Sequence, residues 1–72
     1  MSRTAPITIT VNGRPATAPA GIRIPDFLRA EGLDPQRVVV EWNGRAQTRA
    51  ESAAVALSEG DTLEIVRIVA GG

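Results

Sequence analysis

The chain has 72 residues, and its eight arginines balance eight aspartates plus glutamates, so the formal net charge is zero. Cysteine, histidine and lysine are absent, which excludes disulfides, thiolate metal sites, Schiff-base lysines and catalytic constellations that need a histidine or cysteine. Balanced charge and only two aromatic residues, Phe27 and Trp42, argue against a nucleic-acid interface that relies on phosphate contacts and base stacking.

The first predicted structure is a β-hairpin. Residues 7–11 (Ile-Thr-Ile-Thr-Val) alternate apolar and polar side chains and are all β-branched, a pattern typical of a half-buried strand. Asn12-Gly13 follows, and because both residue types tolerate a positive φ, this pair predicts a tight turn. Residues 14–18 are expected to form the returning strand, and Pro15, which has no N–H, indicates an edge position.

A helix is predicted between Ile24 and Gly32. Pro25 suits the first turn, where a backbone N–H would have no partner, and Asp26 places a negative charge at the positive end of the helix dipole. Gly32 is suited to end the helix, and Leu33 is expected to fold back on its last turn. The residues spaced to face a core are Ile24, Phe27 and Leu28.

The second half of the chain predicts another hairpin and a final strand. Residues 38–42 indicate a strand, and the Asn-Gly pair at 43–44 predicts a turn into a short strand over residues 45–48. Thr48 and Glu51 are spaced as a capping box, which predicts a short helical segment over residues 50–57. After a turn, residues 62–69 are expected to form the last strand.

This order of elements indicates an α+β fold with the β-grasp arrangement. A mixed sheet of four to five strands would have one main helix across one face, with the last strand beside the first in the middle of the sheet. We expect a single domain over residues 1–72, with residues 1–5 as a short N-terminal extension and residues 70–72 as a flexible tail. No signal peptide or membrane-spanning run is recognisable, so we expect a cytoplasmic protein that is monomeric when free.

Strand alternation leaves apolar side chains on the outer side of the predicted sheet. Val66 and Ile68 fall on the same side as Glu64, and Val39 is expected to neighbour them. The patch is interpreted either as ordinary exposed surface, which is common, or as a surface on which a partner protein docks. The residues assigned to this docking surface are Val39, Glu41, Glu64, Val66, Arg67 and Ile68.

The sequence ends with Ala70-Gly71-Gly72 directly after the last predicted strand. Terminal glycines are often frayed ends, but a backbone without Cβ atoms also passes through a narrow channel and leaves the terminal carboxylate unhindered. A nucleotide-activating partner is able to convert that carboxylate into an acyl adenylate. The partner would supply the ATP site, because this sequence has no glycine-rich phosphate loop.

The motifs together resemble a known family. Asn12-Gly13, the segment Glu41-Trp42-Asn43-Gly44, the segment Gly-Asp-Thr-Leu-Glu-Ile-Val at 60–66 and the ending Val69-Ala70-Gly71-Gly72 are similar to ThiS-type sulfur carriers of thiamin biosynthesis. These carriers belong to the ThiS/MoaD group of ubiquitin-like β-grasp proteins. The resemblance extends over nearly the whole chain from about residue 6.

The resemblance implies a role and a set of partners. A ThiF-type enzyme would adenylate the Gly72 carboxylate with ATP, and a sulfurtransferase or cysteine desulfurase would supply sulfur to give a thiocarboxylate. A ThiG-type thiazole synthase would then take the sulfur while Ala70, Gly71 and Gly72 lie in the partner's active site. The carrier would be a protein cosubstrate rather than an enzyme, with no bound cofactor and no metal.

Three other functions remain open from the sequence. The same chemistry serves other sulfur products, such as molybdopterin, cysteine or a secondary metabolite, and a neighbouring gene for thiazole synthase would favour thiazole. A ubiquitin-like modifier would form covalent adducts with target lysines. A non-reactive β-grasp interaction module would keep its function without Gly71 and Gly72.

Overall fold

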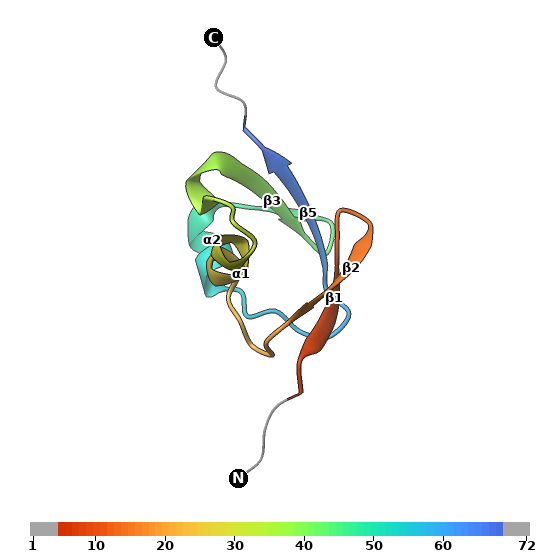
Figure 1. Ribbon diagram of the computed structural model, residues 1–72. Helices are drawn as coiled ribbons and strands as arrows, with labels where there is room; N and C mark the ends of the chain where they lie inside the picture. The colour runs from red at the N-terminus through yellow and green to blue at the C-terminus, as the bar shows by residue number, and fades with distance from the viewer. Residues whose placement is uncertain (1–4, 69–72) are drawn as a thin grey trace.

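Two hairpins, two α-helices and a final strand follow one another within residues 5–68, which are the residues that this computed structural model describes (Figure 1). The predicted order is confirmed, and a short 3₁₀ segment, η1, begins where Asp34-Pro35 indicated only a turn. The elements are β1 (Ile7–Val11), β2 (Arg14–Ala18), α1 (Ile24–Ala30), η1 (Pro35–Arg37), β3 (Val38–Trp42), β4 (Arg45–Gln47), α2 (Arg49–Ala54) and β5 (Thr62–Arg67).

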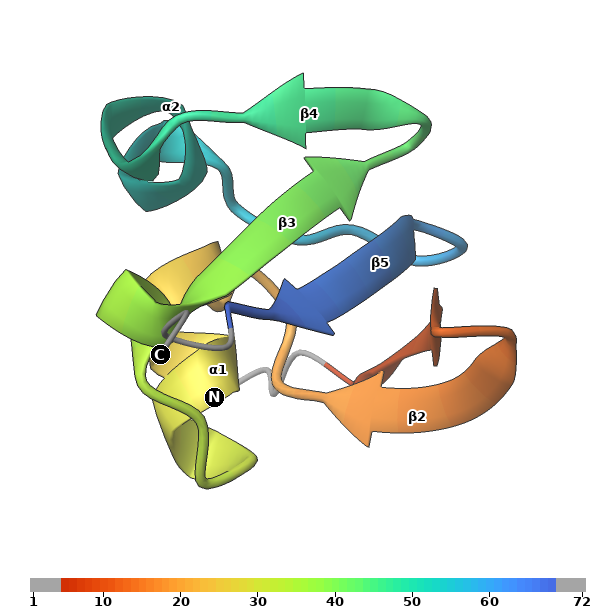
Figure 2. The same cartoon turned by 90° about the horizontal axis from the view of Figure 1, so that it is seen from above.

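The strands of this part of the chain form one mixed sheet in the order β2-β1-β5-β3-β4. β5 lies in the centre, parallel to β1 and antiparallel to β3, and a hairpin extends the sheet on each side (Figure 2). Both helices lie on the same side of the sheet (Figure 1). The α+β, β-grasp prediction is therefore confirmed. We call the side that packs against the helices the inner face, and the opposite side the outer face.

Both Asn-Gly turns have the backbone that the sequence predicts. Asn12 and Asn43 each have a φ of 50°, and the glycines that follow have φ of 81° and 83°. A positive φ at both central residues is the type I′ geometry, in which the turn twists in the same sense as the paired strands. The strand that contains Pro15 is an edge strand, as its missing N–H indicated.

The signals at the ends of α1 act as predicted. Pro25 lies in the first turn, and Gly32 has a φ of 77° just past the last turn. The N–H of Leu33 donates to the carbonyl of Leu28 at 2.9 Å, so the chain reverses over the helix end and the half-buried Leu33 packs against the core.

The second helix begins as predicted but ends earlier. Thr48 N–H donates to Glu51 Oε1 at 2.8 Å and Glu51 N–H donates to Thr48 Oγ1 at 3.1 Å, which is the predicted capping box. The hydrogen bond from the Thr48 backbone also lowers the pKa of the Glu51 carboxyl. α2 ends at Ala54 instead of residue 57, because the chain becomes extended and Leu57 N–H donates to Ile22 O at 2.8 Å.

The core lies between the inner face and the helices. Apolar residues at the ends of the strands, such as Val11 and Trp42, are only half-buried. Helices of seven and six residues are only about 10 Å long, so they leave part of the sheet uncovered. Leu57 was not predicted as a core residue, yet it is 2% exposed. The buried apolar residues are Ile7, Ile9, Ala18, Ile24, Phe27, Leu28, Val40, Leu57 and Leu63.

The predicted terminal segments lie partly or wholly outside the residues that the structure describes. Ala5 and Pro6 are exposed and precede β1, and β5 ends at Arg67. The remaining part of the predicted N-terminal extension and residues 69–72 lie outside the described residues.

Within residues 5–68, none of the helices has the length and apolar character needed to cross a membrane, and acidic side chains do not gather in threes as a metal site would require.

Asp61 joins the turn before β5 to the end of β3. Its Oδ2 accepts hydrogen bonds from Ser58 N–H at 2.8 Å and from Trp42 Nε1 at 3.1 Å, and its Oδ1 accepts one from Asn43 Nδ2 at 3.1 Å. Burial is the largest single influence on this carboxyl and opposes its ionisation, but the hydrogen bonds together outweigh burial and lower the pKa of Asp61. The indole N–H of Trp42 thus has the partner that a half-buried tryptophan requires.

Replacement of this carboxylate tests its contribution to stability. We expect Asp61→Asn to lower the free energy of unfolding at neutral pH by about 1–2 kcal/mol, because hydrogen bonds to an ionised acceptor are lost while solvent moderates the effect. The pKa of Asp61 is lower in the folded state than in the unfolded state. Its contribution is therefore complete above the unfolded pKa of about 3.9 and is lost as the pH falls through the lower folded value.

Urea unfolding of both proteins across the pH range is the measurement. The difference in unfolding free energy between wild type and Asp61→Asn is expected to shrink as the pH falls from neutral to about 2. A difference that stays constant down to the lowest pH would contradict the role of the ionised carboxylate.

Candidate partner-docking surface

Four of the predicted docking residues lie side by side on the outer face. In the antiparallel register of β3 and β5, Val39 is directly opposite Val66, and Glu41 is directly opposite Glu64. Side chains alternate between faces along a strand, and the intervening Val40 is buried in the core. The two pairs therefore point away from the helices.

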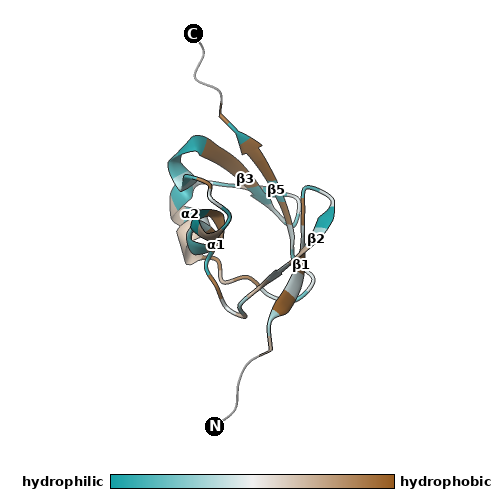
Figure 3. Ribbon diagram, viewed as in Figure 1, coloured by the Kyte–Doolittle hydropathy of each residue, from teal (hydrophilic) through white to brown (hydrophobic). Residues whose placement is uncertain are grey.

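Three apolar side chains on or next to these strands are open to solvent. Val39 is 47% exposed, Val66 is 63% exposed and Ile68 is 54% exposed, and these are the exposed large apolar side chains of residues 5–68. Figure 3 colours the adjoining parts of β3 and β5 as hydrophobic. The predicted exposure is confirmed. The role of the patch in docking stays a prediction, with contiguous exposed apolar surface as its physical basis.

The glutamate pair gives this surface a negative border. Like charges directly opposite each other in an antiparallel pair destabilise it, with pair energies of about 0.2–1 kcal/mol. Glu41 and Glu64 are both exposed, and the ion pairs found among the described residues involve neither of them. An apolar patch with an acidic border is complementary to a partner surface with an apolar centre and basic side chains around it.

Arg67 does not belong to this surface. It is directly opposite Val38 in the sheet, so strand alternation places it on the inner-face side, where it lines a cleft with Leu33, Asp34 and Arg37. The sequence prediction grouped Arg67 with its chain neighbours, but successive side chains of a strand point to opposite faces. The structure separates it from Val39, Glu41, Glu64 and Val66, whereas Ile68 lines the same cleft.

Ile68 remains attached to the sheet beyond the end of β5. Its N–H donates to the carbonyl of Arg37 at 2.8 Å, which extends the pairing between the last strand and the start of β3. Ile68 is also the last described residue. Ala70, Gly71 and Gly72 lie outside the described residues, so the assignment of the tail stays a prediction.

The outer face continues from β5 onto β1 through threonines that the sequence prediction did not include. Thr62 is directly opposite Thr10 in the parallel pairing of the two strands, on the same side as Glu64. The sequence could have predicted this, because the alternation of side chains along residues 7–11 and 62–65 places both threonines on the side of the sheet away from Leu63. Their hydroxyl groups add hydrogen-bonding capacity next to the glutamate pair.

Solved structures share this arrangement of strands and helices. The crystal structure of the thiamine biosynthesis protein ThiS from Geobacter metallireducens has a TM-score of 0.78 and 29% identity, over 92% of this chain and 100% of that one. A solution structure of a thiamine biosynthesis protein from the same organism has a TM-score of 0.73 at 29% identity, over 92% of this chain and 88% of that one. A computationally designed protein based on human erythrocytic ubiquitin has a TM-score of 0.55 at 18% identity, over 96% and 98% of the two chains, and shows the shared fold.

Sequence relatives point in the same direction. A thiazole synthase of Magnetococcus marinus is 38% identical and one of Paramagnetospirillum magneticum is 33% identical, each over 64 residues or 89% of this chain. This chain spans only 20% of the length of either relative. The sequence profile of the ThiS family matches residues 9–72, which is nearly the whole sequence, and the chain therefore belongs to the ThiS family.

Proposed function

We propose that this chain is a sulfur carrier protein for thiazole formation in thiamin biosynthesis. In this role a ThiF-type enzyme adenylates the carboxylate of Gly72, sulfur converts it into a thiocarboxylate, and a ThiG-type thiazole synthase receives the sulfur. The observation that carries the proposal is the ThiS-family match over residues 9–72, which includes both terminal glycines. The similarity to thiamine biosynthesis proteins over the whole fold supports it.

The chemistry requires only an accessible carboxylate from this chain. A carboxylate oxygen of Gly72 attacks the α-phosphorus of ATP, which releases pyrophosphate and leaves an acyl adenylate. The outer sulfur of a persulfide on a sulfurtransferase or cysteine desulfurase attacks the acyl carbon and displaces AMP. A thiol reductant then cleaves the resulting acyl disulfide, which leaves the thiocarboxylate on Gly72 and the donor enzyme's sulfur in a disulfide with the thiol. Partners supply the nucleotide site and the sulfur, so this chain acts as a cosubstrate and not as the catalyst.

The outer face is the surface that we assign to docking during these steps. The exposed Val39, Val66 and Ile68 provide apolar area, and the Glu41–Glu64 pair provides charge that orients a basic partner surface. β5 connects this patch to the tail in sequence, since only residue 69 separates Ile68 from Ala70. A partner that binds the patch would therefore hold the tail close to its own active site.

The relatives support thiazole synthase as the sulfur acceptor. Each of the two thiazole synthases contains a segment similar to this chain within one much longer polypeptide. A carrier segment joined to a synthase in one chain is held at a high effective concentration beside it. A carrier for another sulfur product would use the same tail chemistry, and the thiazole synthase relatives favour the thiazole pathway over it.

The intact mass of the protein from its native host tests the tail chemistry. With the neighbouring biosynthetic genes co-expressed, we expect a mass gain equal to the replacement of one oxygen by one sulfur. Fragmentation is expected to place this gain on Gly72. The same spectrum establishes whether the chain ends with a free carboxylate at Gly72, which the proposal requires.

Two controls make this result specific. A variant without Gly72 is expected to retain its fold and to show no mass gain, and wild-type protein treated with the activating enzyme without ATP is expected to stay unmodified. An unmodified mass under sulfur-replete conditions, together with no adenylate formed by the activating enzyme, would favour the modifier or interaction-module alternatives.

Removal of a charge from the acidic border of the docking surface is expected to raise stability and to weaken binding. Glu64→Gln removes the repulsion with Glu41, so we expect the free energy of unfolding to rise by about 0.2–1 kcal/mol in urea titrations. The same variant should associate more slowly with the activating enzyme, with a weaker dependence on salt, because a charge at the rim of an interface steers association.

The matched control is Glu31→Gln, which removes an equivalent exposed charge from the end of α1. We expect it to leave the association rate and its salt dependence at the wild-type level. It controls for association only, because Glu31 lies at the negative end of the α1 dipole and its neutralisation affects stability by itself. Equal association rates for wild type, Glu64→Gln and Glu31→Gln would show that the outer face is not part of the docking interface.

A further inference from the structure

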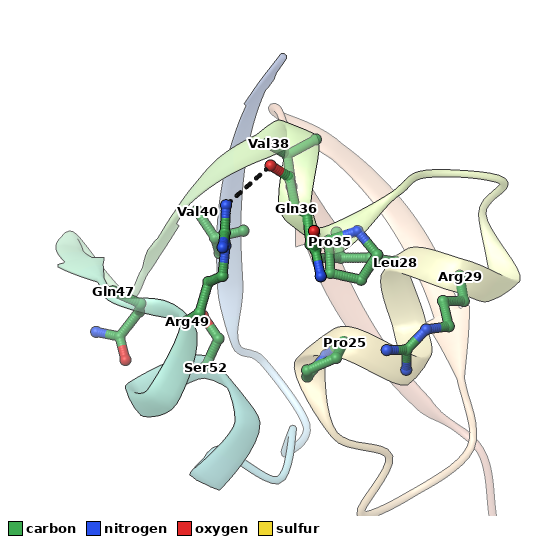
Figure 4. Close-up of a pocket in the computed structure, with 10 residues that line it drawn as sticks. All are labelled: Pro25, Leu28, Arg29, Pro35, Gln36, Val38, Val40, Gln47, Arg49 and Ser52. Carbon is green, nitrogen blue, oxygen red and sulfur yellow. Dashed lines mark hydrogen bonds between the residues drawn. The ribbon is translucent and has the colours of Figure 1, made fainter. Parts of the chain in front are cut away.

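A second candidate contact site lies on the other side of the sheet from the docking surface. A cavity of about 180 Å³ opens between α1, η1, β3, β4 and α2 (Figure 4). Its apolar lining includes Leu28 of α1, Pro35 of η1, and Val38 and Val40 of β3. Leu28 and Val40 are themselves buried, while Pro35 and Val38 are half-buried, and the lining residues come from five separate elements.

The charged side chains that line the cavity are both arginines. Arg29 and Arg49 lie at its rim beside neutral side chains such as Gln47, and its lining among the described residues includes no aspartate or glutamate. Arg29 is already paired, since its Nη1 lies 3.1 Å from Asp26 Oδ1. Arg49 takes part in neither of the ion pairs found within residues 5–68. The cavity thus offers an apolar floor and one guanidinium without a carboxylate partner.

The position of Arg49 does not favour its own helix. Arg49 is the first residue of α2, where a positive side chain opposes the helix dipole. Its Nη2 donates to the carbonyl of Gln36 at 3.2 Å, which directs the guanidinium across the cavity mouth toward η1 (Figure 4). A guanidinium has five N–H donors, so this contact leaves donors for a bidentate bond to a carboxylate.

The size of the cavity limits what it accepts. Pockets for drug-sized ligands and cofactors have volumes of about 300–1,000 Å³, whereas a cavity of about 150 Å³ accepts a group as large as benzene. The observed volume is therefore suited to a single leucine-sized or phenyl-sized side chain. A protein segment supplies such a side chain together with a neighbouring carboxylate.

We infer that this cavity is a docking site for a partner protein that inserts one apolar side chain and pairs an adjacent carboxylate with Arg49. The inference rests on the proposed carrier function, because the partners in question are the enzymes that act on the tail. The cavity and the docking surface lie on opposite faces of the sheet. A partner that reaches around the sheet, or two partners in succession, would be able to use both without competition for the same residues.

Affinity measurements with the full chain test this inference. The dissociation constants for the cognate adenylating enzyme and for the cognate thiazole synthase would be measured with wild type, Arg49→Gln and Arg49→Glu. We expect Arg49→Gln to weaken binding to one of the two by about tenfold, as the loss of a charged hydrogen bond does. Arg49→Glu is expected to weaken it further.

A matched control and a salt titration separate contact from structure. Arg45→Gln removes an exposed arginine that does not line the cavity, and we expect its affinity to stay within about twofold of wild type. Raising the ionic strength should weaken wild type more than Arg49→Gln. A purely structural role of the bond to Gln36 would instead lower the unfolding temperature and leave the salt dependence unchanged.

The outcomes distinguish this inference from the proposed function. If wild type binds the partners and both Arg49 variants bind equally well, the cavity is not a docking site while the carrier role stands. If wild type binds neither enzyme and its tail gains no sulfur, both are overturned. Concentration-dependent self-association that Arg49→Glu abolishes would assign the cavity to a second copy of the chain and overturn the inference.

Discussion

The parallel ladder between β1 and β5 is short, with only Thr10–Thr62 and Val11–Leu63 in register, and one asparagine extends it. Asn12 N–H still donates to the carbonyl of Leu63 at 2.9 Å, and the positive φ of Asn12 then turns the chain into the hairpin. The Asn12 side chain takes over the pairing: Oδ1 accepts from Ile65 N–H at 2.7 Å and Nδ2 donates to Ile65 O at 3.1 Å. The central strand therefore keeps its hydrogen bonds past the end of its neighbour, as buried backbone requires.

The central position of β5 determines what each face of the sheet does. Because β5 is paired on both sides, its register decides that Leu63 enters the core and that Glu64 and Val66 face outward. A one-residue slip would exchange the two sets. The same pairing leaves an apolar patch on the outer face and a cavity on the inner face, and the tail follows in sequence directly from the strand that carries the patch.

Both candidate contact sites hold features that stability alone does not favour. Exposed Val66, the facing carboxylates of Glu41 and Glu64, and Arg49 at the start of a helix each oppose folding slightly or contribute little to it. A domain of this size has a small margin of stability, and natural proteins break local rules mainly at functional sites. These features therefore support the assignment of the two surfaces to binding.

The sequence by itself determined the local structure and the exposure of Val66 and Ile68 in the docking surface. Asn-Gly turns, the ends of α1 and the alternation of Val66 and Ile68 depend on neighbours within a few residues, so local rules predict them. The tertiary structure alone decided the burial of Leu57 in an extended segment and the cavity beside Arg49. These features depend on contacts between segments far apart in the chain, which no local pattern encodes.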